Sequence, residues 1–120
     1  AFNNREDMAE WEKHCKLDDS GKAMCKEFGI SDAVVEELHI KNRTAEALDI
    51  PVFYMGKLVD VRTYTPSATP KMKSRPGSAS GYVIPLDLWL STPVNKVTLI
   101  CAGEKDMAVA RSHGYNTYWW

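Results

Sequence analysis

The chain has 120 residues, of which 44% are hydrophobic and 26% charged, so it has the composition of one soluble globular domain and is short for a two-domain enzyme. No apolar run approaches the roughly 18 residues of a membrane span. The N-terminus is polar and acidic, which excludes a secretory signal. We therefore expect a cytoplasmic protein with no membrane partner.

Charge is unevenly distributed, although the net charge is only -1. Residues 1–40 hold ten acidic side chains against five basic ones, whereas residues 51–75 hold five basic side chains against one acidic. A local basic excess attracts phosphate, and here it predicts a patch rather than a fully basic surface.

The three cysteines, Cys15, Cys25 and Cys101, are odd in number and form no C-x-x-C pair. The histidines also lack the spacing of metal ligands. We expect reduced thiols and no zinc site.

Three short helices are predicted in residues 1–46. The first lies within residues 5–17, where apolar side chains recur at three- and four-residue steps. Gly29 closes the second helix, and Ser31 is a suitable N-cap for the third. The apolar side chains of the three helical faces are Met8, Trp11, Cys15, Ala23, Met24, Phe28, Val34, Val35 and Leu38.

A β-hairpin is predicted over residues 47–64, because the apolar period changes to two from Leu48 onward. Gly56 supplies a turn residue that tolerates positive φ. Pro51 has no backbone N–H, so its strand is expected to be an edge or to be paired only on its other side at that residue.

A long mobile loop is predicted from Thr65 to Gly81, because proline, glycine and serine dominate it. In an extended backbone the alternating Lys71, Lys73 and Arg75 would point the same way. Such a row suits the phosphates of a single strand. Arg62 and Tyr64 could flank it, with Tyr64 or Tyr82 as a ring on which a base stacks. The alternative is an ordinary solvated loop.

The C-terminal residues predict a short strand, a helical turn that starts at Pro85, and then a strand, helix and parallel strand up to residue 119. Glu104 and Asp106 lie in the first turn of that helix. Carboxylates there could hold magnesium beside a phosphate. They are equally what the helix dipole favours without any function.

Four segments in order resemble bacterial and phage Toprim primases and primase-helicases. They are "FGISDAVVEELHI" (28–40), "IPVFYMGKLVDVR" (50–62), "KMKSRPGSASGYVIPLDLW" (71–89) and "VTLICAGEKD" (97–106). The resemblance covers roughly residues 20–119. The ordered set is far more specific than any one of its pieces.

The resemblance implies roles for individual residues. Lys71 matches the family's loop lysine near template and nucleotide, and Pro76 and Gly77 match its turn. Asp106 matches a catalytic, metal-binding acid, but Ala102 stands where the family has glutamate. The family's later Asp-x-Asp pair has no counterpart in this sequence. Mg²⁺ is the cofactor of the intact family, and we expect no tight binding here. Glu104 is the other candidate catalytic acid, although its place two residues further along the turn directs its side chain differently.

The sequence thus predicts an α+β fold with N-terminal helices, a small antiparallel sheet and a partial Toprim-like βαβ unit. The expected divisions are a helical region (1–46), a basic primase-like subdomain (47–95) and the start of a Toprim-like module (96–120). The resemblance implies that the chain is the part of a primase or primase-helicase that binds the single-stranded DNA template. Nucleotides and a helicase domain or subunit are the further partners that it implies. We expect this part to be inactive as an enzyme on its own. The alternative is a replication protein's interaction module that docks a partner through its acidic helices.

Overall fold

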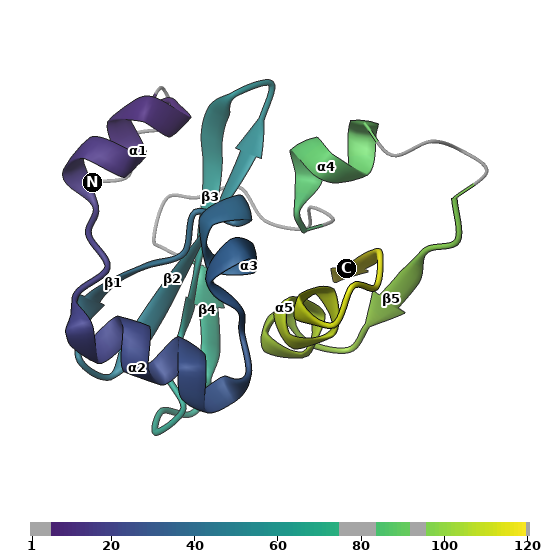
Figure 1. The fold of residues 1–120 in the computed structure, drawn as a ribbon. Coiled ribbons are helices and arrows are strands. Elements are labelled where there is room, and N and C mark those ends of the chain that lie inside the picture. The colour runs from purple at the N-terminus through teal and green to yellow at the C-terminus, as the bar shows by residue number, and fades with distance from the viewer. Residues whose placement is uncertain (1–5, 75–83, 92–95, 120) are drawn as a thin grey trace.

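The α+β fold is confirmed by the computed structural model, which describes residues 6–74, 84–91 and 96–119 (Figure 1). The helices of this part are α1 (Met8–His14), α2 (Asp19–Phe28), α3 (Asp32–Glu37), α4 (Leu86–Ser91) and α5 (Glu104–Ser112). The strands are β1 (Lys41–Thr44), β2 (Ala47–Tyr54), β3 (Lys57–Tyr64), β4 (Met72–Ser74), β5 (Leu99–Cys101) and β6 (Thr117–Trp119).

Local capping sets the first three helices, and the predicted Gly29 stop and Ser31 cap are confirmed. Asp7 and Asp18 are the N-caps of α1 and α2, and each accepts a hydrogen bond from a backbone N–H of the first turn. Gly29 ends α2 with a φ of 82°, which is the left-handed conformation that glycine adopts without steric cost. The Ser31 hydroxyl accepts from the Val34 N–H at 3.3 Å and starts α3.

The predicted hairpin is confirmed as β2 and β3, the central strands of an antiparallel sheet in the order β1-β2-β3-β4. Gly56 lies in its turn with a φ of 78°. Pro51 pairs with Val61 of β3 and lies beyond the register of β1, which ends at Asp49. The residue is therefore paired on one side only, as its missing N–H requires.

Strand β1 was not predicted and lies in the range assigned to helices. It has no apolar alternation, and its buried side chain is Asn42. The Asn42 amide donates to the Asp18 carboxylate at 2.9 Å, and its oxygen accepts from the Asp18 N–H at 3.0 Å. Contacts between distant residues fix this strand, and periodicity cannot reveal them.

The prediction of a mobile loop over residues 65–81 is wrong for Met72–Ser74, which form a strand, whereas residues 65–71 form the turn before it. Strand β4 pairs with β3, and the Thr65 N–H donates to the Lys71 carbonyl at 2.7 Å to close the turn between them. The edge of β3 offers backbone hydrogen-bonding groups that composition does not show. The rest of the predicted loop, residues 75–81, lies outside the described residues.

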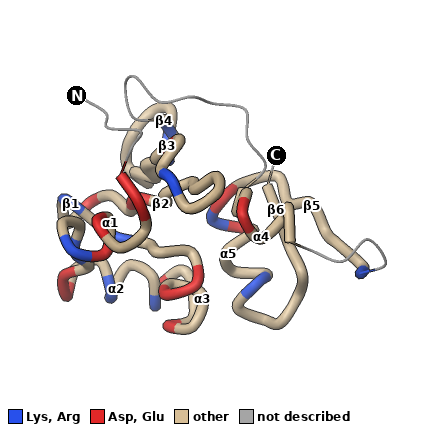
Figure 2. Tube along the Cα trace, turned by 90° about the horizontal axis from the view of Figure 1, so that it is seen from above, with Lys and Arg blue, Asp and Glu red and all other residues tan. Residues whose placement is uncertain are grey.

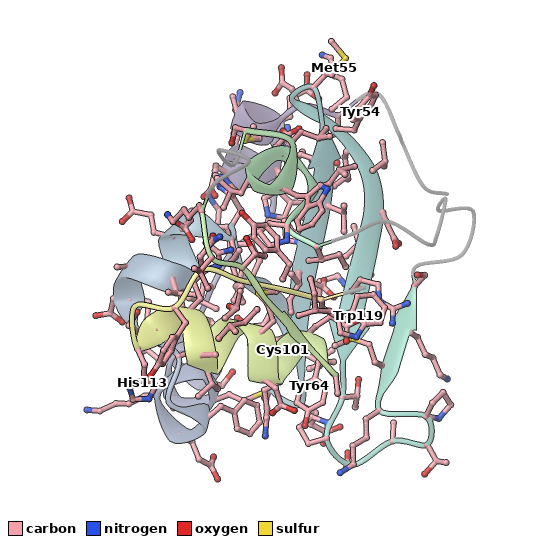
Figure 3. All side chains as sticks on the ribbon, turned by 90° about the vertical axis from the view of Figure 1, so that its right-hand side faces the viewer. Tyr54, Met55, Tyr64, Cys101, His113 and Trp119 are labelled. Carbon is pink, nitrogen blue, oxygen red and sulfur yellow. The ribbon has the colours of Figure 1, made fainter. Side chains whose placement is uncertain are left out.

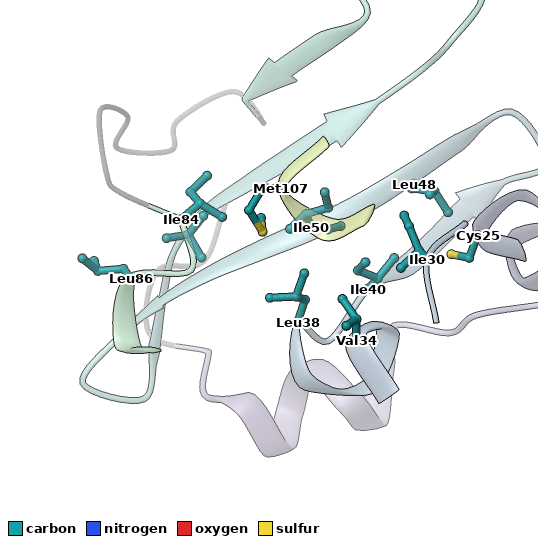
Figure 4. Packing of buried hydrophobic residues seen from close by; sticks show 12 residues of the cluster. Cys25, Ile30, Val34, Leu38, Ile40, Leu48, Ile50, Ile84, Leu86 and Met107 are labelled. Atoms are coloured by element: carbon teal, nitrogen blue, oxygen red, sulfur yellow. The ribbon is translucent and has the colours of Figure 1, made fainter. Parts of the chain in front are cut away.

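The main core lies between the sheet and the helices α2, α3 and α5, where apolar side chains of β2 meet those of α5 (Figure 4). A smaller cluster around Trp11, which is 0% exposed, joins α1 to the hairpin. The main cluster contains Cys25, Ile30, Val34, Leu38, Ile40, Leu48, Ile50, Val52, Ile84, Leu86, Met107 and Ala108. Each half of the chain therefore contributes to one continuous core.

The C-terminal strand-helix-strand unit has the predicted parallel pairing, with β5 beside β6 and α5 between them in sequence. Ile84 exchanges two backbone hydrogen bonds with Trp119 at 2.8 and 2.9 Å, so β6 is held on both sides at that residue. Among the described helices, none is long and apolar enough to cross a bilayer.

Cys15, Cys25 and Cys101 are free thiols in the structure. Burial, together with the nearby negative charge of Asp32, raises the pKa of Cys25 to about 11. Cys25 is thus a core residue and a poor nucleophile at neutral pH.

Candidate nucleic-acid interface

Lys71 and Lys73 are exposed at the open edge of the four-stranded sheet, on or just before β4. Residues Met72 to Ser74 are extended, which supports the predicted alternation of the two lysines. No acidic side chain among the described residues forms an ion pair with either lysine. The other predicted members of this region, Arg75, Pro76, Gly77 and Tyr82, lie outside the described residues.

The expectation that Arg62 and Tyr64 flank the lysines is wrong. Arg62 pairs with Ser74, and Tyr64 pairs with Met72, whereas Lys73 pairs with Thr63. Directly paired residues of an antiparallel sheet share a face, and successive residues alternate. Arg62 and Tyr64 therefore point to the face opposite that of Lys73.

Arg62 is the centre of a buried polar cluster. Its Nε and Nη2 donate to one carboxylate oxygen of Glu104 at 3.0 and 2.9 Å, and its Nη1 donates to the Ser74 hydroxyl at 2.9 Å. The guanidinium also lies 5.1 Å from the ring centre of Trp119. The cluster joins β3, β4, α5 and β6, and it leaves the arginine little freedom to bind a phosphate.

Tyr64 packs on the same face against α2. Its ring meets Phe28 edge-on, with centres 5.6 Å apart (Figure 3). Lys105 of α5 lies 5.2 Å from the centre of the Phe28 ring. Tyr64 is therefore engaged between elements and does not extend the row of lysines.

Of the two acidic residues predicted as site residues at the start of α5, only one is exposed. Glu104 is 3% exposed and bound by Arg62, whereas Asp106 faces solvent. Ala102 is exposed and supplies no carboxylate at the position where the resemblance expects one. Gly103 is the N-cap of α5 and makes no side-chain capping bond.

This donor set does not fit a magnesium ion. Mg²⁺ is held through hard oxygen ligands and gives up its water shell reluctantly. The described residues contain no group of three or more His, Cys, Asp or Glu side chains that could hold a metal. Asp106 remains the predicted metal ligand, and its neighbours supply no second carboxylate directed to the same point.

Arg43 is a basic residue that the sequence did not single out. Asp49, Thr63 and Lys73 lie in register across β2, β3 and β4, so they share the face opposite Arg62. The Arg43 Nε donates to Asp49 at 2.8 Å, while the arginine side chain stays 58% exposed. Arg43 thus adds a third basic residue to the face of the lysines. Figure 2 shows basic positions on β1 and beside β4. Only the pairing of β1 and β2 could have shown this.

A depression of about 340 Å³ lies beside Arg43 on this face. Its walls come from β1, β2 and β3 and the turn that follows, namely Arg43, Thr44, Glu46, Ala47, Asp49, Thr63 and Thr65. The Thr63 hydroxyl donates to Asp49 at 2.6 Å, which fixes the floor. We call the surface of Arg43, Lys71 and Lys73 the outer basic face.

A second, larger groove of about 770 Å³ lies between α1, α2 and α3 and was not predicted. Glu12 bridges His39 and Lys41 there. Burial raises the pKa of Glu12, but hydrogen bonds and the charges of Lys41 and His39 outweigh it, so the pKa is lowered overall. The groove carries both signs of charge and gives no clear preference for an anion or a cation.

Two solved structures are similar to this chain, both at 11% sequence identity. A DnaG catalytic core matches with a TM-score of 0.63 over 90% of this chain. A DnaG primase catalytic domain bound to single-stranded DNA matches with a TM-score of 0.67 over 93% of this chain. The chain shares the fold of DnaG primase catalytic cores. It spans about half of their length, 49% and 51%.

The sequence itself matches no family model and no curated protein. The likeness to DnaG catalytic cores therefore rests on structure.

Proposed function

We propose that this chain is the template-binding part of a DNA primase and that its outer basic face holds single-stranded DNA. The observation that carries the proposal is the structural match over 93% of the chain to a primase catalytic domain that was itself bound to single-stranded DNA. The exposed Lys73 of β4 and Lys71 just before it give that fold a suitable surface for phosphates in this chain.

The contacts in this interface are electrostatic. Lys71 and Lys73 have no acidic partner among the described residues, so each can neutralise a phosphate and release a counterion. Arg43 shares its charge with Asp49 and should contribute less. Arg62 takes no part, because Glu104 already neutralises it.

The test is the affinity of a fluorescent oligothymidylate at several salt concentrations for the wild type, Lys71→Ala and Lys73→Ala. Each substitution should weaken binding equally for all base sequences and reduce the salt slope by about 0.7. The matched control is Lys13→Ala, an exposed lysine on α1, which should change neither quantity. Wild-type slopes for both lysine variants would refute the interface.

A wild-type chain that binds no oligonucleotide at low salt would favour the alternative function, a protein-interaction module that uses the acidic helices. The two functions are separable because attraction of nucleic acid to the lysines weakens with salt in proportion to the phosphates contacted. Nucleotides and a helicase domain or subunit are the further partners that the proposed primase would have.

We further propose that the chain alone makes no primer and holds no magnesium tightly. Asp106 is the one exposed carboxylate at the start of α5, and Lys105 beside it disfavours a cation. Magnesium titration followed at the amides of residues 102–107, with a dinucleotide-synthesis assay, tests this. Ala102→Glu should raise metal affinity only modestly. Saturation at micromolar magnesium or a template-dependent product would overturn the proposal.

A further inference from the structure

The turn between β1 and β2 brings an acidic side chain to the outer basic face. Glu46 lies in this turn, is exposed, and lines the depression of about 340 Å³ together with Arg43, Asp49, Thr63 and Thr65. Because the four strands are antiparallel and follow one another in order, this turn lies at the same end of the sheet as the turn between β3 and β4 (Figure 1). The depression therefore adjoins the lysines of the outer basic face.

Basic residues lie on both sides of the depression. Thr63, which lines it, pairs with Lys73 of β4, and the N–H of Thr65 donates to the Lys71 carbonyl. Arg43 of β1 is at the other side, across the full width of the sheet, which is about 14 Å at the usual strand spacing. A nucleic-acid strand that crosses the sheet from β4 to β1 would pass over the depression between these cations.

The two acidic side chains of the depression differ in what they can still bind. Each Asp49 carboxylate oxygen already accepts a hydrogen bond, one from Arg43 Nε at 2.8 Å and one from Thr63 Oγ1 at 2.6 Å, and the Asp49 side chain is 3% exposed. The Glu46 carboxylate makes no hydrogen bond or ion pair with any residue that the structure describes. A carboxylate only accepts hydrogen bonds, whereas the threonine hydroxyls both donate and accept. Glu46 is therefore the group that can select one ligand over another.

The size and lining of the depression suit one base that is read by hydrogen bonds. Its volume lies at the small end of the roughly 300 to 1,000 Å³ of ligand pockets. None of the residues that line it is aromatic, so a base entering it finds no ring on which to stack. Stacking tolerates every base, whereas hydrogen bonds to the base edge discriminate among them.

We propose that the depression receives one unstacked base of the single strand and that Glu46 selects guanine there. This inference rests on the proposed function, because the outer basic face holds the phosphates on either side. The Watson–Crick edge of guanine presents the N1–H and the N2 amino group side by side, so one carboxylate accepts from both. The same edge of cytosine, adenine or thymine sets acceptor atoms beside its donor, and these would face the negative charge of Glu46.

The experiment measures the affinity of fluorescent oligothymidylate and of the same oligonucleotide with its central thymidine replaced by dG or by deoxyinosine. The dG probe should bind about fivefold more tightly than oligothymidylate, at the lower end of the discrimination of a bidentate pair because the depression is open. Deoxyinosine stacks much as dG does but lacks the N2 amino group, and it should gain less than about twofold.

Glu46→Gln keeps the size of an exposed side chain and removes its charge. This variant should bind oligothymidylate about twofold more tightly, because a repulsive charge is lost, and its preference for dG should fall below about twofold. Glu27→Gln on α2, an exposed acid away from this face, is the matched control and should change neither quantity. Lys71→Ala should weaken binding of all probes equally and leave their ratios unchanged.

The outcomes separate this inference from the proposed function. Equal wild-type affinity for the dG probe and oligothymidylate, with binding that still weakens with salt, would overturn the guanine site and leave the proposed function standing. The guanine site would also be overturned if deoxyinosine matched dG, or if Glu46→Gln kept the full preference. If the wild type bound no probe at low salt, both the proposed function and this inference would be wrong.

Discussion

Removing the Glu104 carboxylate should destabilise the whole fold. In Glu104→Gln, the Arg62 guanidinium would keep the Ser74 hydroxyl and the Trp119 ring but lose the carboxylate that it contacts directly, while Asp60 would still accept from the Ser74 hydroxyl at 3.1 Å. The side chains of Arg62 and Glu104 are only 17% and 4% exposed. The substitution therefore leaves a positive charge in a place that water reaches poorly.

The expected cost is about 3 kcal/mol in the free energy of unfolding. Breaking a buried ion pair by removing one partner typically costs about 3 to 5 kcal/mol, and the remaining contacts of Arg62 place this case at the lower end. Arg62→Met with Glu104→Met should cost less than the sum of the single changes, because neither charge is then left alone. The coupling energy should be about 2 kcal/mol.

Urea unfolding followed by tryptophan fluorescence measures these quantities, with constant m-values as the check on two-state behaviour. The control is Lys57→Met, which removes a 4.0 Å ion pair with Asp7 whose side chains are 57% and 41% exposed. That change should cost less than about 1 kcal/mol. If Glu104→Gln costs no more than Lys57→Met, Glu104 is not a structural residue and its assignment as a catalytic acid regains weight.

Three further predictions concern the sheet and its junction with α2. Gly21→Ala should lower the free energy of unfolding by about 1 to 3 kcal/mol, since its Cβ would lie 2.1 Å from Asn42 Oδ1, whereas a Cβ at the control Gly103→Ala would come no nearer than 3.8 Å to Asp106; equal urea midpoints would contradict this. Hydrogen bonds from Ser20, Asn42 and the Gly21 N–H lower the pKa of Asp18 to about 2 from 3.8. The Asp18 carboxylate therefore contributes fully to the free energy of unfolding above about pH 4, and this contribution is lost as the pH falls toward 2. Asp18→Asn should flatten the acid unfolding profile in that window, and an unchanged profile would refute the linkage. Amides of β4 should exchange with deuterium more slowly than those of Ser67 and Thr69. Equally fast exchange would instead support the sequence-based prediction that the whole of residues 65–74 is a mobile loop.

The helices were predictable because their signals are local. The Ser31 cap and the Gly29 stop act within one helical turn of themselves, so their effect can be read without knowing the tertiary fold. The hairpin was predictable for the same reason, since its apolar alternation and Gly56 turn are contiguous. Strands β1 and β4 were not, because each is specified by the strand beside it.

The candidate site was predictable in its residue types but not in its grouping. Composition identifies the basic excess of residues 51–75, and alternation places Lys71 and Lys73 together. Whether Arg62 joins them depends on the register of β3 and β4, which the turn closed by Thr65 and Lys71 sets. A shift of one residue would exchange the faces, so the sequence pattern could not decide it.

Whether a basic side chain of this molecule can bind a phosphate depends on whether an acidic side chain already contacts it, and not on its charge alone. Counterion release requires a side chain that can turn from water to a phosphate, and Arg62 would have to abandon Glu104 first. Arg62→Ala should therefore reduce DNA binding only as far as it unfolds the protein, whereas Lys71→Ala should reduce binding with the fold intact. Measuring affinity and the unfolding midpoint on the same two variants separates these effects. A folded Arg62→Ala with a reduced salt slope would show that Arg62 contacts the template directly, and the boundary of the outer basic face would then have to include both sides of β3.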